Sequence, residues 1–199
     1  MKLLNLAALA ALVGFATPVF GEQKEVAATT ESSAKAAAFT LKDLDGKEHS
    51  LSDFAGKTVV LEWVNFDCPY VKKHYSSMNM QTLQETYTGK DVVWLSVASG
   101  KTAGKTTKEV AKDSKATAVL LDPTGATGKA YDAKTTPHLI VIDKDGSIAY
   151  DGAIDSKNST DAADISSSEN YLKPALDAVL AGKQVEMAKS KPYGCSVKY

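Results

Sequence analysis

The residue with the clearest chemical potential in this sequence is Cys68, which stands between Asp67 and Pro69. A cysteine reacts as its thiolate, and the backbone dipoles and free N–H groups at a helix N-terminus lower the thiol pKa. Proline is favoured at the first position of a helix, so we expect Cys68 at the N-cap, with its sulfur over the helix start. The alternative is a buried, inert cysteine, which would suit a more apolar neighbourhood. We therefore predict that Cys68 is a nucleophile.

Glu62 is the second unusual residue, because it lies inside the apolar run 59–64. Burying an ionised carboxylate costs several kcal/mol, and a buried carboxyl responds with a raised pKa. If the strand runs under the helix start, a residue six positions before Cys68 reaches the sulfur through one water. Glu62 would then transfer protons to and from the Cys68 thiol. An edge glutamate that faces solvent is the open alternative.

The elements that must position these residues alternate between strands and helices. Runs with almost no polar residues predict strands buried on both faces, and alternation with helices predicts a mostly parallel sheet. Two pairs of short runs joined by Gly-containing turns predict hairpins. The expected strands are 39–41, 49–51, 58–64, 92–97, 119–121, 139–142 and 148–150, and the expected helices are 70–87 and 171–180.

We assign no chemical role to the polar segment 99–115, and we expect ordinary positions for the three histidines. Five lysines of this segment recur at helical spacing and predict a solvated helix face. We expect His49 and His74 to be exposed, and His138 to lie at a strand edge.

The N-terminus has the layout of a secretory signal peptide: a lysine, an apolar run too short to span a bilayer, and small residues near Gly21. The formal charge is −1 and the pI about 6.3. The chain therefore lacks the excess of positive charge that would attract nucleic acid or an anionic membrane surface. We predict an exported protein, periplasmic or extracellular, without a membrane span after cleavage. The expected organisation is a signal peptide 1–21, a flexible leader 22–38, one domain 39–183 and a C-terminal tail 184–199.

Four motifs of the chain are specific: Glu62-Trp63-x-Asn65-x-x-Cys68-Pro69-Tyr70-Val71, Thr136-Pro137-His138, Gly152–Asp155 and Pro192–Tyr199. On these motifs the chain resembles a group of exported thioredoxin-family, redoxin-domain proteins. The resemblance implies a thioredoxin-like α/β fold: a central mixed sheet flanked by helices, here with an N-terminal hairpin extension and a C-terminal tail. It also implies a cis Thr136–Pro137 bond facing Cys68, with Trp63 and Glu62 where thioredoxins keep an aromatic residue and a buried acid.

The departures from related families bear on the activity. Thioredoxins carry a second cysteine three positions after the first, where this chain has Val71. Peroxiredoxins place proline seven positions and threonine or serine three positions before their cysteine, where this chain has Leu61 and Asn65. They also use an arginine to hold the peroxide, and all 23 basic residues here are lysine. A peroxiredoxin-like thiol peroxidase with an antioxidant role is therefore the second prediction, after a thiol–disulfide oxidoreductase.

Cys195 is the second cysteine, and in an exported protein two cysteines usually become oxidised. We expect a Cys68–Cys195 disulfide, with Cys195 as the resolving partner on a mobile tail; an intermolecular disulfide or a free thiol stays open. We expect protein or small-molecule disulfides, or peroxides, as substrates, an external thiol as reductant and no cofactor. Substrates would dock by backbone pairing near Pro137, with Trp63, Pro69 and Thr136 as further contacts. Copper handling through Cys68, His74, His138 or Cys195 is a weaker third alternative.

Overall fold

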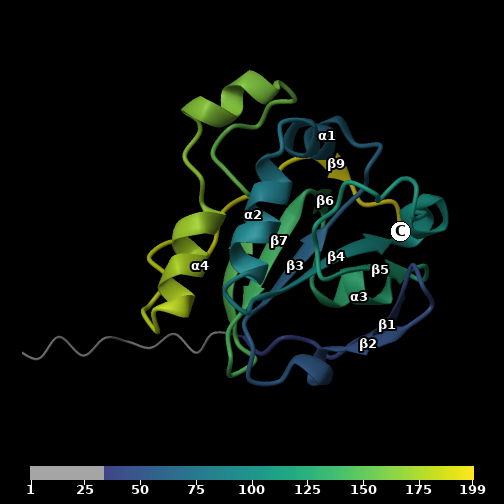
Figure 1. Ribbon diagram of the computed structural model, residues 1–199, viewed down its shortest axis with the longest axis horizontal. Helices are drawn as coiled ribbons and strands as arrows, with labels where there is room; N and C mark the ends of the chain where they lie inside the picture. Colours follow the sequence, from purple (N-terminus) through teal and green to yellow (C-terminus); the bar gives the residue numbers. More distant parts are fainter. Residues whose placement is uncertain (1–33) are drawn as a thin grey trace, which may run out of the picture. The chain divides into compact units, whose positions relative to one another are not determined.

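The computed structural model describes residues 34–199, and the predicted signal peptide lies outside this range. The described part consists of a seven-stranded mixed sheet with helices on both faces and a separate two-stranded sheet of β6 and β9 (Figure 1). None of its helices is long and apolar enough to cross a membrane. The predicted α/β architecture is confirmed, with the strand order β2-β1-β5-β4-β3-β7-β8. In chain order the strands are β1 Thr40–Asp43, β2 Glu48–Ser50, β3 Val59–Trp63, β4 Val93–Ser99, β5 Ala118–Asp122, β6 Thr135–Thr136, β7 His138–Ile142, β8 Ile148–Gly152 and β9 Cys195–Ser196.

The centre of the sheet is parallel and its margins are antiparallel. Strands β3, β4 and β5 run in parallel, as expected for buried runs linked by crossovers. β7 pairs antiparallel with β3, and the β7–β8 and β1–β2 hairpins complete the sheet. The helices are α1 Pro69–Ser76, α2 Asn79–Thr88, α3 Ala126–Ala130 and α4 Leu172–Leu180, with 3-10 helices at Leu51–Phe54, Gly100–Lys105 and Ala162–Ser167.

The alternation of side chains along β3 creates two cores, one on each face of the sheet. Val60 and Val64 belong to the core under α1, α2 and α4, whereas Val59, Leu61 and Trp63 belong to the core on the opposite face. Glu62 lies on the same face as Val60, and its Oε1 accepts a hydrogen bond from α1. The strand therefore decides which of the predicted site residues lie on the side of the sheet that α1 covers.

The predicted helix 70–87 is interrupted after Ser76. Met78 adopts a left-handed conformation with φ of 62°, although it is not a glycine. Side chains satisfy the carbonyls at the end of α1: Ser77 Oγ donates to Lys73 O at 2.8 Å, and Gln81 Nε2 donates to Tyr75 O at 2.9 Å. The apolar spacing did not reveal this break, because the residues on either side of it face the same core.

The lysine-rich segment 99–115 differs from its prediction, because it forms a 3-10 helix and turns with no α-helix. Gly100 at its start has φ of 61°, and a Cβ there would lie 2.2 Å from Lys198 O. The neighbouring Lys101 N–H donates to the same carbonyl at 2.7 Å. Contact with the C-terminal tail therefore fixes the start of this segment in a shape that an α-helix cannot adopt.

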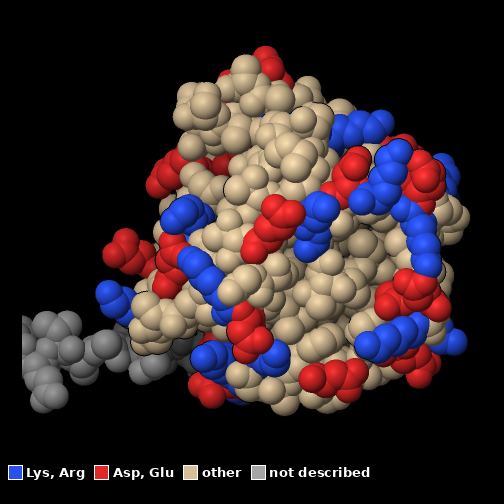
Figure 2. All heavy atoms as spheres, viewed as in Figure 1, with Lys and Arg blue, Asp and Glu red and all other residues tan. Residues whose placement is uncertain are grey.

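The end of the predicted leader lies against the sheet. Lys35 forms a β-bridge with Ser147, and Ala36 N–H donates to Gly146 O at 2.9 Å. Acidic and basic side chains are interspersed over the face of the domain in Figure 2. This mixture agrees with a formal charge near zero.

Candidate active site around Cys68 and Cys195

Cys68 occupies the N-cap of α1, as predicted from the following proline. Its backbone is extended (φ −69°, ψ 126°), Pro69 is the first helical residue, and the Cys68 carbonyl accepts the N–H of Lys72 at 2.9 Å. The loop before it is shaped by Asn65, whose Oδ1 accepts the N–H of Asp67 at 3.0 Å. The cysteine is nonetheless almost covered, with 2% of its surface exposed.

The Thr136–Pro137 bond is cis, as the resemblance implied, and both residues are buried. The carbonyl of Thr136 faces the cysteine and accepts a hydrogen bond from the Cys68 thiol at 3.2 Å. Pro69 is exposed at the helix start beside the thiol. Three of the predicted site residues, Cys68, Pro69 and Thr136, therefore lie together.

The tail brings Cys195 to the same place. Strand β9 pairs antiparallel with β6, and its register sets Cys195 opposite Thr136. Two hydrogen bonds hold the tail on the C-terminal side of this pair: Val197 N–H donates to Lys134 O at 3.0 Å, and Tyr199 Oη donates to Ala133 O at 2.6 Å. Both cysteines are free thiols, so the disulfide stays a prediction.

The two thiols have opposite pKa shifts. Burial raises the pKa of Cys68, but hydrogen bonds from the Cys195 side chain, the Val71 backbone and Thr136 outweigh burial and lower it overall. Burial raises the pKa of Cys195 to about 11, and the hydrogen bond to Cys68 and its negative charge act in the same direction. These opposite shifts mean that Cys68 loses its proton more readily than Cys195 does.

Glu62 is fully buried, as the apolar run predicted, and the edge alternative is excluded. Burial raises its pKa, against hydrogen bonds that favour the ion. Its Oε1 accepts from Tyr75 Oη at 3.2 Å, and its Oε2 accepts from Gln84 Nε2, Trp94 Nε1 and Ser96 Oγ at 3.0, 2.9 and 2.9 Å. Among the described residues no hydrogen bond joins Glu62 to Cys68 directly. A role in moving protons for the thiol stays a prediction.

Trp63 does not lie where a substrate contact would require it. It is fully buried on the face of the sheet opposite to Glu62. Its Nε1 donates to Ser99 Oγ at 3.2 Å, and its ring packs against Tyr131 at a centroid distance of 5.4 Å. The residue after Glu62 must point away from it in a strand, so the two cannot both face the thiol.

The histidines are more buried than predicted. His74 has none of its surface exposed, because the tail and the loop that contains Asp155 cover α1, and its Nδ1 pairs with Asn79 Nδ2 at 2.8 Å. His49 and His138 are also buried, each against an aspartate, at 2.8 Å from Asp43 and 2.6 Å from Asp151.

Within residues 34–199 no group of three or more ligand side chains could hold a metal ion, so the copper alternative gains no support.

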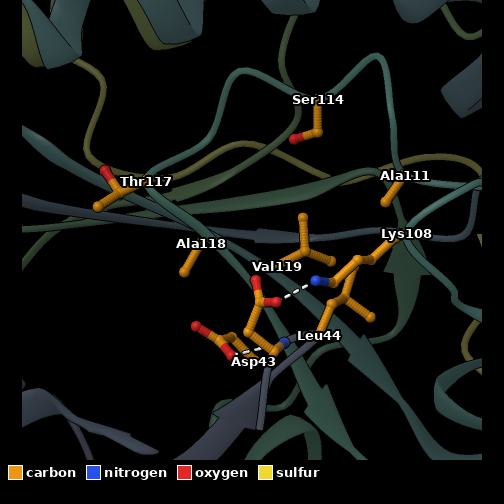
Figure 3. A pocket seen from close by; sticks show the side chains of 9 residues that line it. Asp43, Leu44, Lys108, Ala111, Ser114, Thr117, Ala118 and Val119 are labelled. Carbon is orange, nitrogen blue, oxygen red and sulfur yellow. Dashed lines mark hydrogen bonds and ion pairs between the residues drawn. The ribbon is translucent and has the colours of Figure 1, made fainter. Parts of the chain in front are cut away.

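A groove of about 630 Å³ is lined mainly by the tail residues 187–194, and neither cysteine lines it. Tyr70, Thr135 and Gly194 line it, and each lies within two residues of Cys68, Thr136 or Cys195. A smaller pocket of about 220 Å³ lies between the β1–β2 turn and residues 108–119 (Figure 3). An ion pair between Lys108 and Asp45 spans that second pocket, and no cysteine lines it.

Residues that the sequence did not single out lie behind the site. Lys73, Asp155 and Tyr193 are buried together and in contact. Asp155 and Tyr193 belong to the motifs that carried the resemblance, which was the available signal. Lys73 gave none, because a lysine in an amphipathic helix is normally exposed.

The comparisons with known proteins agree with this fold. The sequence model of the redoxin family matches residues 31–172. A hypothetical protein from Sinorhizobium meliloti is 23% identical, with a TM-score of 0.70 over 84% of this chain and 93% of that one. An uncharacterized conserved protein from Geobacillus kaustophilus is 27% identical, with a TM-score of 0.70 over 84% of this chain and 91% of that one. A putative thiol:disulfide interchange protein DsbE from Chlorobium tepidum is 25% identical, with a TM-score of 0.51 over 61% and 84%. No curated protein matches the chain.

Proposed function

The chain belongs to the redoxin family, and from that premise we propose that it is a thiol–disulfide oxidoreductase with Cys68 as nucleophile and Cys195 as resolving cysteine. One observation carries the proposal: β9 pairs Cys195 with Thr136, whose carbonyl accepts from the Cys68 thiol, and a hydrogen bond with the Cys195 side chain lowers the pKa of Cys68. The likeness to a putative thiol:disulfide interchange protein supports the same class of reaction.

The reaction consists of two exchanges. The Cys68 thiolate attacks one sulfur of a substrate disulfide, the substrate S–S bond breaks, and a mixed disulfide forms as one substrate thiolate leaves. Cys195 then attacks the Cys68 sulfur, and the second substrate thiolate leaves. The Cys68 thiolate and the Cys195 thiol supply both electrons, Cys195 supplies one proton, and solvent supplies the other, which Cys68 released when it ionised. The Cys68–Cys195 disulfide is the oxidised product. An external thiol regenerates the reduced form.

The opposite pKa shifts order these two steps. In the resting pair the negative charge on Cys68 helps to keep Cys195 protonated. Once Cys68 is consumed in the mixed disulfide, that charge and its hydrogen bond disappear, and burial alone raises the pKa of Cys195. Cys195 therefore becomes a better attacking group only when there is a mixed disulfide to resolve.

Access to Cys68 requires movement of the tail, because the thiol is almost fully covered with β9 paired to β6. The groove lined by Tyr70, Thr135 and Gly194, neighbours in sequence of the site residues, offers a place for the remainder of the substrate. Backbone pairing with Thr135 and Thr136 is open to a substrate segment once β9 has left. The N-terminal sequence supports an oxidising compartment outside the cytoplasm as the place of the reaction.

The test uses the mature chain and single cysteine variants with bis(2-hydroxyethyl) disulfide as substrate. Cys195→Ser should accumulate a mixed disulfide at Cys68, visible by non-reducing mass spectrometry, because the second exchange is blocked. Cys68→Ser should form none and should lose turnover. Turnover that survives in Cys68→Ser would exclude the assignment. Hydrogen peroxide serves as a second substrate: consumption far above that of free cysteine would favour the peroxidase alternative.

A further inference from the structure

A buried polar cluster lies behind the cysteine pair, and the two exchanges do not use its side chains. It consists of Lys73 and His74 of α1, Asp155 after β8, and Tyr193 of the tail, each at most 8% exposed. A buried ion pair is weak evidence for stability, because removing two charges from water offsets their attraction. The placement of Tyr193 suggests what the cluster does for the site.

Asp155 is the centre of the cluster. Its Oδ1 accepts hydrogen bonds from Tyr193 Oη at 2.5 Å and from the Lys157 N–H at 2.9 Å. Its Oδ2 lies 3.8 Å from Lys73 Nζ and accepts from Ser168 Oγ at 3.2 Å. Lys73 Nζ also donates to Lys157 O at 3.0 Å and lies 5.6 Å from the centroid of the Tyr193 ring. Tyr193 therefore contacts both charges of the pair.

Tyr193 connects this cluster to Cys195, which lies two residues further along the tail. Between them, Gly194 has φ of 134°, and its backbone passes so close to Thr136 that a Cβ would lie 2.0 Å from the Thr136 carbonyl oxygen. The Tyr193 ring also packs against Tyr70, two residues after Cys68, at a centroid distance of 5.9 Å. On the N-terminal side of Cys195 the tail is thus anchored next to the site by the Tyr193 side chain, and further back by Ser190, whose N–H donates to Asp151 O at 3.1 Å.

We propose that Tyr193, anchored by Asp155 and Lys73, is a positioning residue that holds Cys195 at the Cys68 sulfur and so raises the effective concentration of Cys195 in the second exchange. The proposal rests on the proposed function, since it assumes that Cys195 resolves the mixed disulfide. The physical reason is effective concentration: a thiol held at its target reacts far faster than one on a free chain or in solution. Strand β9 has only two residues, so its ladder alone is a weak anchor.

The first experiment measures the effective concentration of Cys195 toward Cys68, from the equilibrium of the mature protein with reduced and oxidised glutathione. In Tyr193→Phe the ring remains and only the hydroxyl is lost. Loss of a hydrogen bond to a charged group predicts a fall in effective concentration of at least about tenfold. The matched control is Tyr171→Phe, because among the described residues no hydrogen bond of the Tyr171 hydroxyl is found; it should leave the value unchanged.

The second readout is the pKa of Cys68, from thiolate absorbance at 240 nm. Tyr193→Phe should raise this pKa toward the value of Cys195→Ser, because a displaced Cys195 no longer donates to the thiolate. In a Cys195→Ser background the Tyr193→Phe substitution should have no further effect. A merely structural tyrosine would lower thermal stability and leave both readouts unchanged.

Variants at Asp155 provide a second check, in which Tyr193 itself is left unchanged. Asp155→Asn keeps an acceptor for the Tyr193 hydroxyl and should retain most of the effective concentration, whereas Asp155→Ala should behave like Tyr193→Phe. Unchanged effective concentration and Cys68 pKa in folded Tyr193→Phe and Asp155→Ala would overturn the positioning role, while leaving the proposed function intact. If the wild type itself forms no Cys68–Cys195 disulfide, both proposals fail.

Discussion

The buried carboxyl of Glu62 gives the most direct quantitative prediction from this structure. Its raised pKa means that the folded chain keeps a proton that the unfolded chain releases near the ordinary value of 4.5. Raising the pH above 4.5 therefore favours the unfolded state, until the pH reaches the higher pKa of the folded state. Over that interval this one group removes about 1.4 kcal/mol of stability per pH unit.

Glu62→Gln is the perturbation that isolates this effect. The amide oxygen can accept the three hydrogen bonds that Oε2 now receives from Gln84, Trp94 and Ser96, and the amide nitrogen can donate to the Tyr75 oxygen. The substitution thus keeps the shape and the hydrogen bonds and removes only the titration. The stability of the variant relative to the wild type should rise with pH from about 4.5 at about 1.4 kcal/mol per unit and then level off.

The assay is urea unfolding of both reduced proteins, followed by far-UV circular dichroism at intervals from pH 4 to pH 8. Because other groups titrate equally in both chains, the difference between the two free energies of unfolding reports Glu62 alone. Parallel curves would show that the carboxyl titrates normally, and an opposite slope would show that its four hydrogen bonds outweigh burial. Either result refutes the reasoning. The Cys68 pKa of the same variant tests whether Glu62 serves the thiol.

Two further predictions concern residues near the site. Burial lowers the pKa of His74 to about 4, with the Lys73 charge acting in the same direction and Asp155 opposing. The unfolded chain binds this proton near pH 6.5, so stability should fall by about 1.4 kcal/mol per pH unit as the pH drops from 6.5 toward 4. In His74→Gln, the free energy of unfolding should no longer fall with pH in this way when unfolding is measured between pH 6.5 and 4. The same pH dependence in the variant and the wild type would contradict the prediction. Gly194→Ala should lose about 1–3 kcal/mol or more and form the Cys68–Cys195 disulfide more slowly in thiol-trapping assays, since its φ is unfavourable and its Cβ would clash with Thr136. Gly104→Ala, with nothing within 4 Å of its Cβ, is the matched control, and equal effects would refute the steric argument.

Local sequence was a good guide where the relevant interactions are themselves local. The apolar runs gave the three central parallel strands, because strands buried on both faces carry few polar residues. Pro69 gave the helix start, and with it the N-cap position of Cys68, because proline at the first helical position costs no hydrogen bond. The apolar residues on both sides of Glu62 indicated that its side chain is buried.

The expectations for Trp63, His74 and the segment 99–115 failed because contacts between distant parts of the chain decide them. Alternation along β3 sends Trp63 to the opposite core, although it is adjacent to Glu62 in sequence. His74 is buried by a loop and a tail that come more than 80 residues later, and the tail also shapes the segment after β4.

By itself, the sequence determined the redoxin fold, the position of Cys68 at a helix start and the presence of a second thiol 127 residues later. It left open whether the two thiols lie side by side, because that depends on how the tail 184–199 packs. The packing requires a strand with which β9 can pair, close approach of the backbone at Gly194 and a hydrogen-bond partner for Tyr193. Only the tertiary structure decided that point. The pairing of β9 with β6 and the anchor at Asp155 are long-range contacts, and their free energy has no signature in local spacing.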